Sequence, residues 1–228
     1  MNHNRRGMTF WYNTALITFA AVAIGMTWTI MNSGFSSSEV MKDVVEHAAT
    51  HSANSLQIIG KMTGAANVAD NEVTVTATPV TSTTNGNVDV SPDKTKVTYM
   101  IIKEGSHTIT YDNIYVGMLS DNSYNSLSDA LNAAKKAGLI EIDPTKDAEK
   151  PQTTSAFVYW IINQNSDGAV QNNEIASLVV VYADKDRPST GEYLAIEVLG
   201  KIGTLLRIER NVPNISSSIL DFGGKVRT

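Results

Sequence analysis

Cysteine is absent from the 228 residues of the chain. Disulfide bonds and thiolate zinc sites are therefore excluded, so a folded domain has to be held by its core, by partners or by other metals. Clustered positive charge is also lacking, because the formal net charge is −5 and the Lys and Arg residues are scattered. Nucleic-acid-binding proteins carry a basic patch or stripe, so we expect no nucleic-acid partner.

Sequence signatures of catalysis are missing as well. His47 and His51 are four residues apart, but Ala48 stands where zinc peptidases of the His-Glu-x-x-His type carry glutamate. We interpret the two histidines as solvated side chains on a helix surface. The chain has no Gly-x-Ser-x-Gly elbow, and the stretch from Gly60 to Thr63 lacks the spacing of a phosphate-binding loop. We expect that the chain is not an enzyme and requires no cofactor.

The N-terminal part contains one long stretch without charge, from Met8 to Met31, and Arg5 and Arg6 precede it. About 20 apolar residues suffice to cross a bilayer, and the two arginines favour a cytoplasmic N-terminus. An ordinary signal peptide has a shorter apolar region followed by a small-residue cleavage site, which does not fit this stretch. A plain single-pass anchor fits the hydropathy equally well.

A helical pattern resumes after Gly34. Apolar and small residues recur at steps of three and four from Met41 to Ile59, which makes one stripe on a helix, and we expect Gly60 to end that helix. One helix from Met8 to Ile59 would be about 78 Å long at ~1.5 Å per residue. That length is over twice the thickness of the hydrocarbon core of a bilayer, about 30 Å.

From Asn71 onward the pattern of apolar residues changes to a period of two, with Gly, Asn, Asp and Pro between the runs. Several short strands with such turn signals predict an antiparallel β-sandwich. One insertion, Leu127–Ala137, is predicted to be helical, with Ser126 as its cap and Gly138 as its stop. The expected strands are 73–77, 97–101, 109–111, 178–182, 193–199 and 203–210.

The loop from Asn163 to Glu174 carries the sharpest local signal for a ligand. Its spacing matches an EF-hand loop, with Gly168 at the sixth position and Glu174 as a bidentate carboxylate at the twelfth. An expected strand follows in place of a helix, and the alternative is a polar turn built on Gly168 and asparagines. The candidate calcium ligands are Asn163, Asn165, Asp167, Ala169 and Glu174.

The chain contains one N-glycosylation triplet with a permitted middle residue, Asn214-Ile215-Ser216. It lies near the C-terminus, on the side of the uncharged segment that is expected outside the cell. Such triplets also occur by chance, so Asn214 is a glycosylation candidate.

Several blocks of the sequence resemble one known family. The junction Arg5-Arg6-Gly7-Met8 resembles the class III leader of archaellins and type IV pilins. Further blocks, in family order from end to end, resemble archaeal flagellins (archaellins) of the type IV pilin-like superfamily. They are 32–35 after the uncharged stretch, 55–60 at the expected helix end, 88–91 with 96–99 as the first strand pair, and 205–213 as a C-terminal strand.

The resemblance implies an α+β fold, with a long N-terminal apolar α-helix followed by an immunoglobulin-like antiparallel β-sandwich with a small helical insertion. A prepilin/prearchaellin peptidase would cut between Gly7 and Met8. The implied parts are a removed leader (1–7), a filament-core helix (8–60) and an outer β-sandwich (61–228). Tyr12 stands where bacterial pilins usually carry glutamate, which disfavours a bacterial pilin. The expected core-helix residues are Phe10, Leu16, Ile17, Phe19, Val22, Ile24, Trp28, Ile30 and Phe35.

The function implied by the resemblance is structural. The chain is expected to be a subunit of the archaellum, an extracellular motility filament, alone or together with other archaellins. Archaellum assembly machinery would add it from a precursor that is inserted transiently in the membrane. An adhesion pilus built from a type IV pilin-like subunit is the first alternative. A membrane-anchored binding or enzymatic sandwich that never polymerises is the second.

Overall fold

The structure, a computed structural model, describes residues 55–83, 86–103, 105, 107–146, 150–201 and 203–223. The chain divides into two units, Met1–Thr50 and His51–Thr228, and every described residue belongs to the second. The expected cleavage site, the uncharged stretch and the core-helix residues from Phe10 to Phe35 lie outside the described residues. In the described part, no helix is long and apolar enough to span a membrane.

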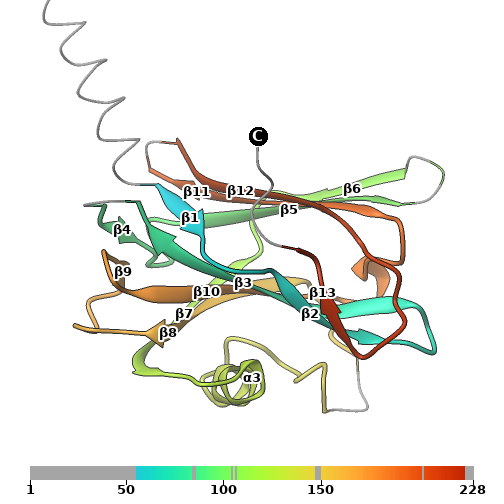
Figure 1. Cartoon of the computed structure of the whole chain (residues 1–228), viewed down its shortest axis with the longest axis horizontal. Helices are drawn as coiled ribbons and strands as arrows, with labels where there is room; N and C mark the ends of the chain where they lie inside the picture. Colours follow the sequence, from blue (N-terminus) through green and yellow to red (C-terminus); the bar gives the residue numbers. More distant parts are fainter. Residues whose placement is uncertain are drawn as a thin grey trace, which may run out of the picture. The chain divides into compact units, whose positions relative to one another are not determined.

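The second unit is built on two packed β-sheets (Figure 1). The larger sheet has the order β13-β2-β3-β10-β8-β7, with β1 also pairing with β3, and the smaller has the order β12-β11-β5-β6. A third, two-stranded sheet joins β4 to β9. The larger sheet consists of β1 (Leu56–Ile58), β2 (Thr63–Asn67), β3 (Glu72–Ser82), β7 (Tyr115–Ser123), β8 (Ser155–Ile162), β10 (Ile175–Val181) and β13 (Ile219–Asp221). The others are β4 (Val88–Asp89), β5 (Lys96–Lys103), β6 (His107–Tyr111), β9 (Ala169–Val170), β11 (Tyr193–Gly200) and β12 (Gly203–Asn211).

The main core lies between the two large sheets. Strands of the smaller sheet contribute every second residue to it, because successive side chains of a strand point to opposite faces. Val97, Tyr99 and Ile101 of β5 are all buried there. Leu194 and Ile196 of β11 lie in the same core. The alternation that predicted these strands is confirmed.

A second core covers the other face of the larger sheet, where α3 (Leu127–Lys136) packs (Figure 1). Leu131 of the helix shares this core with Phe157 of β8 and Val179 of β10. A strand that is buried on both faces shows no alternation and reads as a continuous apolar run. Both β8 and β10 have this pattern. Strand β10 was predicted from its apolar run at 178–182, whereas β8 was not predicted.

Helix α3 has the ends that the sequence predicts. Ser126 is its N-cap, and the backbone N–H of Asp129 donates to Ser126 Oγ over 3.1 Å. At the other end Gly138 has a φ of +74°, a left-handed conformation that glycine adopts without steric penalty. Only the last residue differs, since Ala137 is the C-cap and not part of the helix.

The prediction that the N-terminal helix extends to Ile59 is wrong. Residues Leu56–Ile58 form strand β1, which pairs antiparallel with β3, and the N–H of Ile59 donates to the carbonyl of Pro79 over 2.9 Å. Leu56 is 7% exposed and belongs to the main core. The sandwich therefore begins before residue 61, and Gly60 lies between two strands. A three-residue strand is too short for its period to be distinguished from a helical one.

Two expectations about strand pairing are also corrected. The sandwich is not wholly antiparallel, because β7 pairs parallel with β8. Parallel neighbours need a long crossover connection, and the segment that contains α3 supplies it. Residues 88–91 and 96–99 supply strands β4 and β5 as expected, but the two do not pair with each other. Strand β4 pairs with β9, and β5 lies between β11 and β6.

Candidate functional sites

The candidate calcium loop connects β8 to β10 and is anchored by Glu174. The side chain of Glu174 is 1% exposed. Its Oε1 accepts from the N–H of Gln164 over 2.8 Å, and its Oε2 accepts from the N–H of Gln171 over 3.0 Å. The carboxylate that was expected to chelate a cation thus holds two backbone segments of the loop together.

The other candidate ligands make short-range hydrogen bonds within the same loop. Asn163 Oδ1 accepts from the N–H of Ser166 over 2.9 Å, and Asp167 Oδ1 accepts from the N–H of Ala169 over 2.9 Å. Asx side chains commonly form such turns. Gly168 occupies the expected turn with a φ of +76°, and a Cβ added there would lie 2.6 Å from Met118 Cε. The turn role of Gly168 is therefore confirmed.

Calcium binding by this loop remains a prediction. Among the described residues, no group of three or more His, Asp or Glu side chains is arranged to hold a metal ion. Asp167 Oδ2 also accepts from Gln171 Nε2 over 2.5 Å. A cation would have to displace these internal donors to reach the carboxylates of Asp167 and Glu174.

The glycosylation candidate lies in the loop between β12 and β13. Asn214 and Ser216 are exposed, whereas Ile215 between them is buried. The N–H of Ile215 donates to Thr190 Oγ1 over 3.1 Å, which fixes the backbone of the triplet. The loop therefore presents the Asn214 side chain to solvent, as an acceptor site needs, and the occupancy of the site stays a prediction.

One polar cluster, around Asp186, was missed in the sequence. This buried carboxylate accepts from Tyr111 Oη over 2.8 Å and from Thr154 Oγ1 over 2.7 Å. The backbone carbonyl of Asp186 accepts from Tyr99 Oη over 3.0 Å. Burial, and then the hydrogen bond and charge of Asp186, raise the pKa of Tyr111 to about 12. The cluster ties β5 and β6 of the smaller sheet to the start of β8 in the larger one.

A second polar cluster surrounds Arg187, whose side chain is 4% exposed. Its Nη1 lies 3.5 Å from Glu72 Oε2 and 3.6 Å from Asp184 Oδ1. Lys150 Nζ donates to Asp184 Oδ1 over 2.7 Å, and this hydrogen bond holds the pKa of Asp184 below its ordinary value. Both cations already face carboxylates, so we interpret the cluster as a structural ion-pair network.

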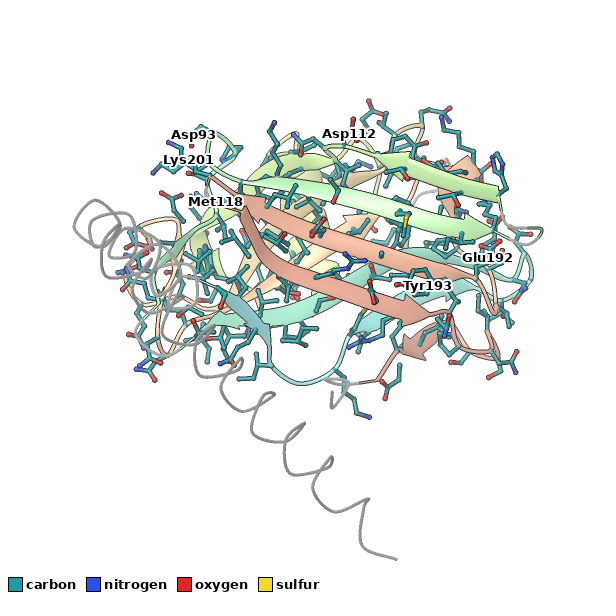
Figure 2. All side chains as sticks on the ribbon, turned by 90° about the horizontal axis from the view of Figure 1, so that it is seen from above. Asp93, Asp112, Met118, Glu192, Tyr193 and Lys201 are labelled. Atoms are coloured by element: carbon teal, nitrogen blue, oxygen red, sulfur yellow. The ribbon has the colours of Figure 1, made fainter. Side chains whose placement is uncertain are left out.

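Polar side chains dominate the outer face of the smaller sheet, onto which Figure 2 looks. Glu197 Oε1 accepts from Thr204 Oγ1 over 2.9 Å, and Arg207 Nε donates to Glu209 Oε1 over 2.6 Å. Tyr193 lies at one end of β11 in Figure 2, and Lys201 lies just past the other end. This face is compatible with water, whereas the outer face of the larger sheet is covered by α3.

Comparison with known proteins relates the chain to archaeal flagellins. No protein-family model matches it. It is 26% identical over 201 residues to "Probable flagellin 1" of Aeropyrum pernix, and the match covers 87% of each chain. The crystal structure of archaeal flagellin FlaB1 from Methanocaldococcus jannaschii aligns with a TM-score of 0.55 at 14% identity. That match covers 77% of this chain and all of the other.

The structure of the archaeal flagellum of Methanospirillum hungatei strain JF1 also aligns with this chain, with a TM-score of 0.40 at 12% identity. It covers 90% of this chain and 93% of that one. The similarity in sequence to a flagellin and the fold shared with FlaB1 agree with the resemblance seen in the sequence blocks. The chain is a homologue of archaeal flagellins (archaellins).

Proposed function

We propose that this chain is the structural subunit of the archaellum, the extracellular motility filament of archaea. The observation that carries the proposal is the similarity to a probable flagellin over 87% of both chains. Because that match nearly spans both chains, it argues for a shared role of the whole protein and not of one module. The flagellin-like fold of the described unit supports the same function.

Polymerisation would use the N-terminal segment. Met8–Met31 contains no charged residue, so cleavage after Gly7 would leave an apolar segment on the mature chain. Burial of apolar surface contributes about 25 cal/mol per Å² relative to water, but lipid is already apolar. Transfer from membrane to filament therefore gains little, and an energy-consuming assembly machinery would have to drive it. A prepilin/prearchaellin peptidase would act on the membrane-inserted precursor.

The described unit has properties that suit the outer part of such a filament. Its stability comes from two apolar cores and buried polar clusters without disulfide bonds. The polar outer face of the smaller sheet tolerates water. The role is passive and structural: the filament would transmit torque from a separate motor, and other archaellins can share the polymer with this chain.

Deleting the gene that encodes the chain tests the proposal. We expect the deletion strain to lose swimming, and surface appendages sheared from the parent strain to contain the chain with Met8 at its N-terminus. Negative-stain microscopy and mass spectrometry of the purified filament are the measurements. A strain that swims but no longer attaches to surfaces would point to an adhesion pilus. A full-length chain that stays a membrane-embedded monomer would rule out any filament.

A further inference from the structure

A polar pocket of about 540 Å³ lies between strand β2 and the chain that follows α3. Its lining combines residues of β2, such as Ala66 and Asn67, with Thr145 from the later segment. Lys150 and Arg187 are the two charged side chains that line it in the described part of the protein. Ligand pockets usually measure about 300–1,000 Å³, so this one has room for a small molecule.

The guanidinium group of Arg187 is buried at the wall of this pocket, but it is loosely held. Its Nη1 lies 3.5 Å from Glu72 Oε2 and 3.6 Å from Asp184 Oδ1, and both distances exceed the usual N–H···O length of about 2.9 Å. Arg187 Nε and Glu72 Oε2 are buried without a hydrogen-bond partner among the described residues. Buried polar groups are nearly always hydrogen-bonded. The fitting partner is therefore a group that accepts from a guanidinium and donates to a carboxylate.

A hydroxyl group has this combination, because its oxygen accepts hydrogen bonds and its proton donates one. The charges around the pocket indicate that the ligand that carries the hydroxyl is neutral. The two cations are paired, at distances of 2.7 to 3.9 Å, with the carboxylates of Asp70, Glu72 and Asp184. An anion therefore gains no net attraction from these side chains, and a cation would have to displace Lys150 or Arg187.

The rest of the lining suits the carbon skeleton of such a ligand. Ala65, Ala66, Val68 and Pro144 supply apolar surface, and Val68 is 45% exposed. Other positions carry amide or hydroxyl groups, as at the exposed residue Ser218. A sugar ring has C–H faces and a rim of hydroxyl groups, so one ring can contact the apolar surface and form hydrogen bonds with the polar groups at the same time.

We propose that the pocket beside Arg187 binds a neutral saccharide. Hydroxyl groups of the sugar accept from the guanidinium of Arg187 and donate to the carboxylate of Glu72, and its C–H groups lie against the apolar surface of the pocket. This is a binding activity in addition to the proposed filament function, and it does not depend on that function.

Titration of the full-length chain with sugars, followed by saturation-transfer NMR, tests the proposal. The chain is kept in a detergent without a sugar head group, so that the detergent does not compete for the pocket. The probes are glucose, galactose and mannose. We expect at least one to bind with a dissociation constant on the order of millimolar, which a ligand of about 12 non-hydrogen atoms reaches at ordinary ligand efficiency. The corresponding uronate should bind about tenfold more weakly, because its carboxylate is repelled by the carboxylates around the pocket.

Two variants locate the binding in this pocket. Ser218→Trp fills the pocket from an exposed position and should abolish binding. Ser217→Trp is the matched control, because Ser217 is the neighbouring residue and is exposed but does not line the pocket, and it should bind sugar as the natural chain does. Arg187→Lys keeps the charge but loses the planar set of donors, and it should weaken binding about tenfold. Thermal unfolding of each variant shows whether it is still folded.

Three results would overturn the proposal. They are no binding of any of the sugars up to about 100 mM, binding that Ser218→Trp leaves unchanged, and a uronate that binds as tightly as its neutral sugar. A pocket that holds only water gives the first of these results. The measurement does not involve assembly, so its failure leaves the filament function intact. A chain that binds sugar but forms no filaments would refute the filament function and not the pocket.

Discussion

The hydroxyl group of Tyr111 makes a hydrogen bond whose contribution to the free energy of unfolding can be predicted. It donates to Asp186 Oδ1 over 2.8 Å, and Asp186 is 1% exposed. Tyr111→Phe keeps the ring, which stacks on Tyr99 with planes 3° apart, and removes only the donor. A hydrogen bond to a charged group contributes about 1.5–3 kcal/mol. We therefore expect a loss of about 2 kcal/mol in the free energy of unfolding.

The assay is thermal unfolding of the full-length chain in detergent, followed by circular dichroism. For a domain of 150–250 residues, 1 kcal/mol shifts Tm by about 2–4 °C, so Tyr111→Phe should lower Tm by about 4–8 °C. Tyr193→Phe is the matched control, because Tyr193 is bonded to Glu209 and Arg207 at the surface and such changes usually stay within ~0.5 kcal/mol.

A double-mutant cycle that combines Tyr111→Phe with Asp186→Asn measures the interaction between these two side chains. Asp186→Asn replaces the carboxylate by an amide and so removes the charge that strengthens the hydrogen bond from Tyr111. The coupling free energy between the two changes should be about 1–2 kcal/mol. If Tyr111→Phe is no more harmful than Tyr193→Phe, the idea that the Asp186 cluster joins the two sheets is refuted.

Three further predictions concern other parts of the described unit. Ser126→Ala should destabilise the fold by about 1 kcal/mol because it removes the N-cap of α3; an unchanged denaturant midpoint would contradict this. Millimolar calcium should raise the Tm of the protein, and Glu174→Gln should abolish this increase. An unchanged Tm in the presence of calcium, together with no heat of binding in calorimetry, would refute the calcium hypothesis. Hydrogen bonds from Lys150 and Lys61 lower the pKa values of Asp184 and Asp221. Their stabilisation should be complete above the ordinary carboxylate pKa, about 4, and should fade as pH falls further. High salt should weaken this acid dependence, and an acid transition that is insensitive to salt would argue against it.

Local chemistry explains which parts of the fold were predictable. The cap at Ser126 and the stop at Gly138 act within a few residues, so α3 was predicted almost to the residue. Strands β5 and β11 bury one face and expose the other, so their period of two is visible in the sequence. The turn at Gly168 follows from the same local rules.

Candidate sites were harder to predict, because a side chain's role depends on its neighbours in space. Glu174 was predicted as a calcium ligand, which stays a prediction, whereas its hydrogen bonds to the backbone N–H groups of Gln164 and Gln171 are visible only in the structure. Asp186 lies in a short charged run that looks like surface. It is buried because Tyr111 and Thr154, 75 and 32 residues away in the chain, supply its hydrogen bonds.

Three features can be recognised from the amino-acid sequence alone: the division between an uncharged N-terminal stretch and a β-rich remainder, the helix within that remainder, and the resemblance to archaellins. Hydropathy, period and capping are local properties, so they can be seen without a structure. The three-dimensional arrangement was needed to show that Leu56–Ile58 is a strand and that β7 runs parallel to β8. Those features depend on pairing between segments that are far apart in the chain. The contacts that stabilise such pairing are not visible in the order of residues within any one segment.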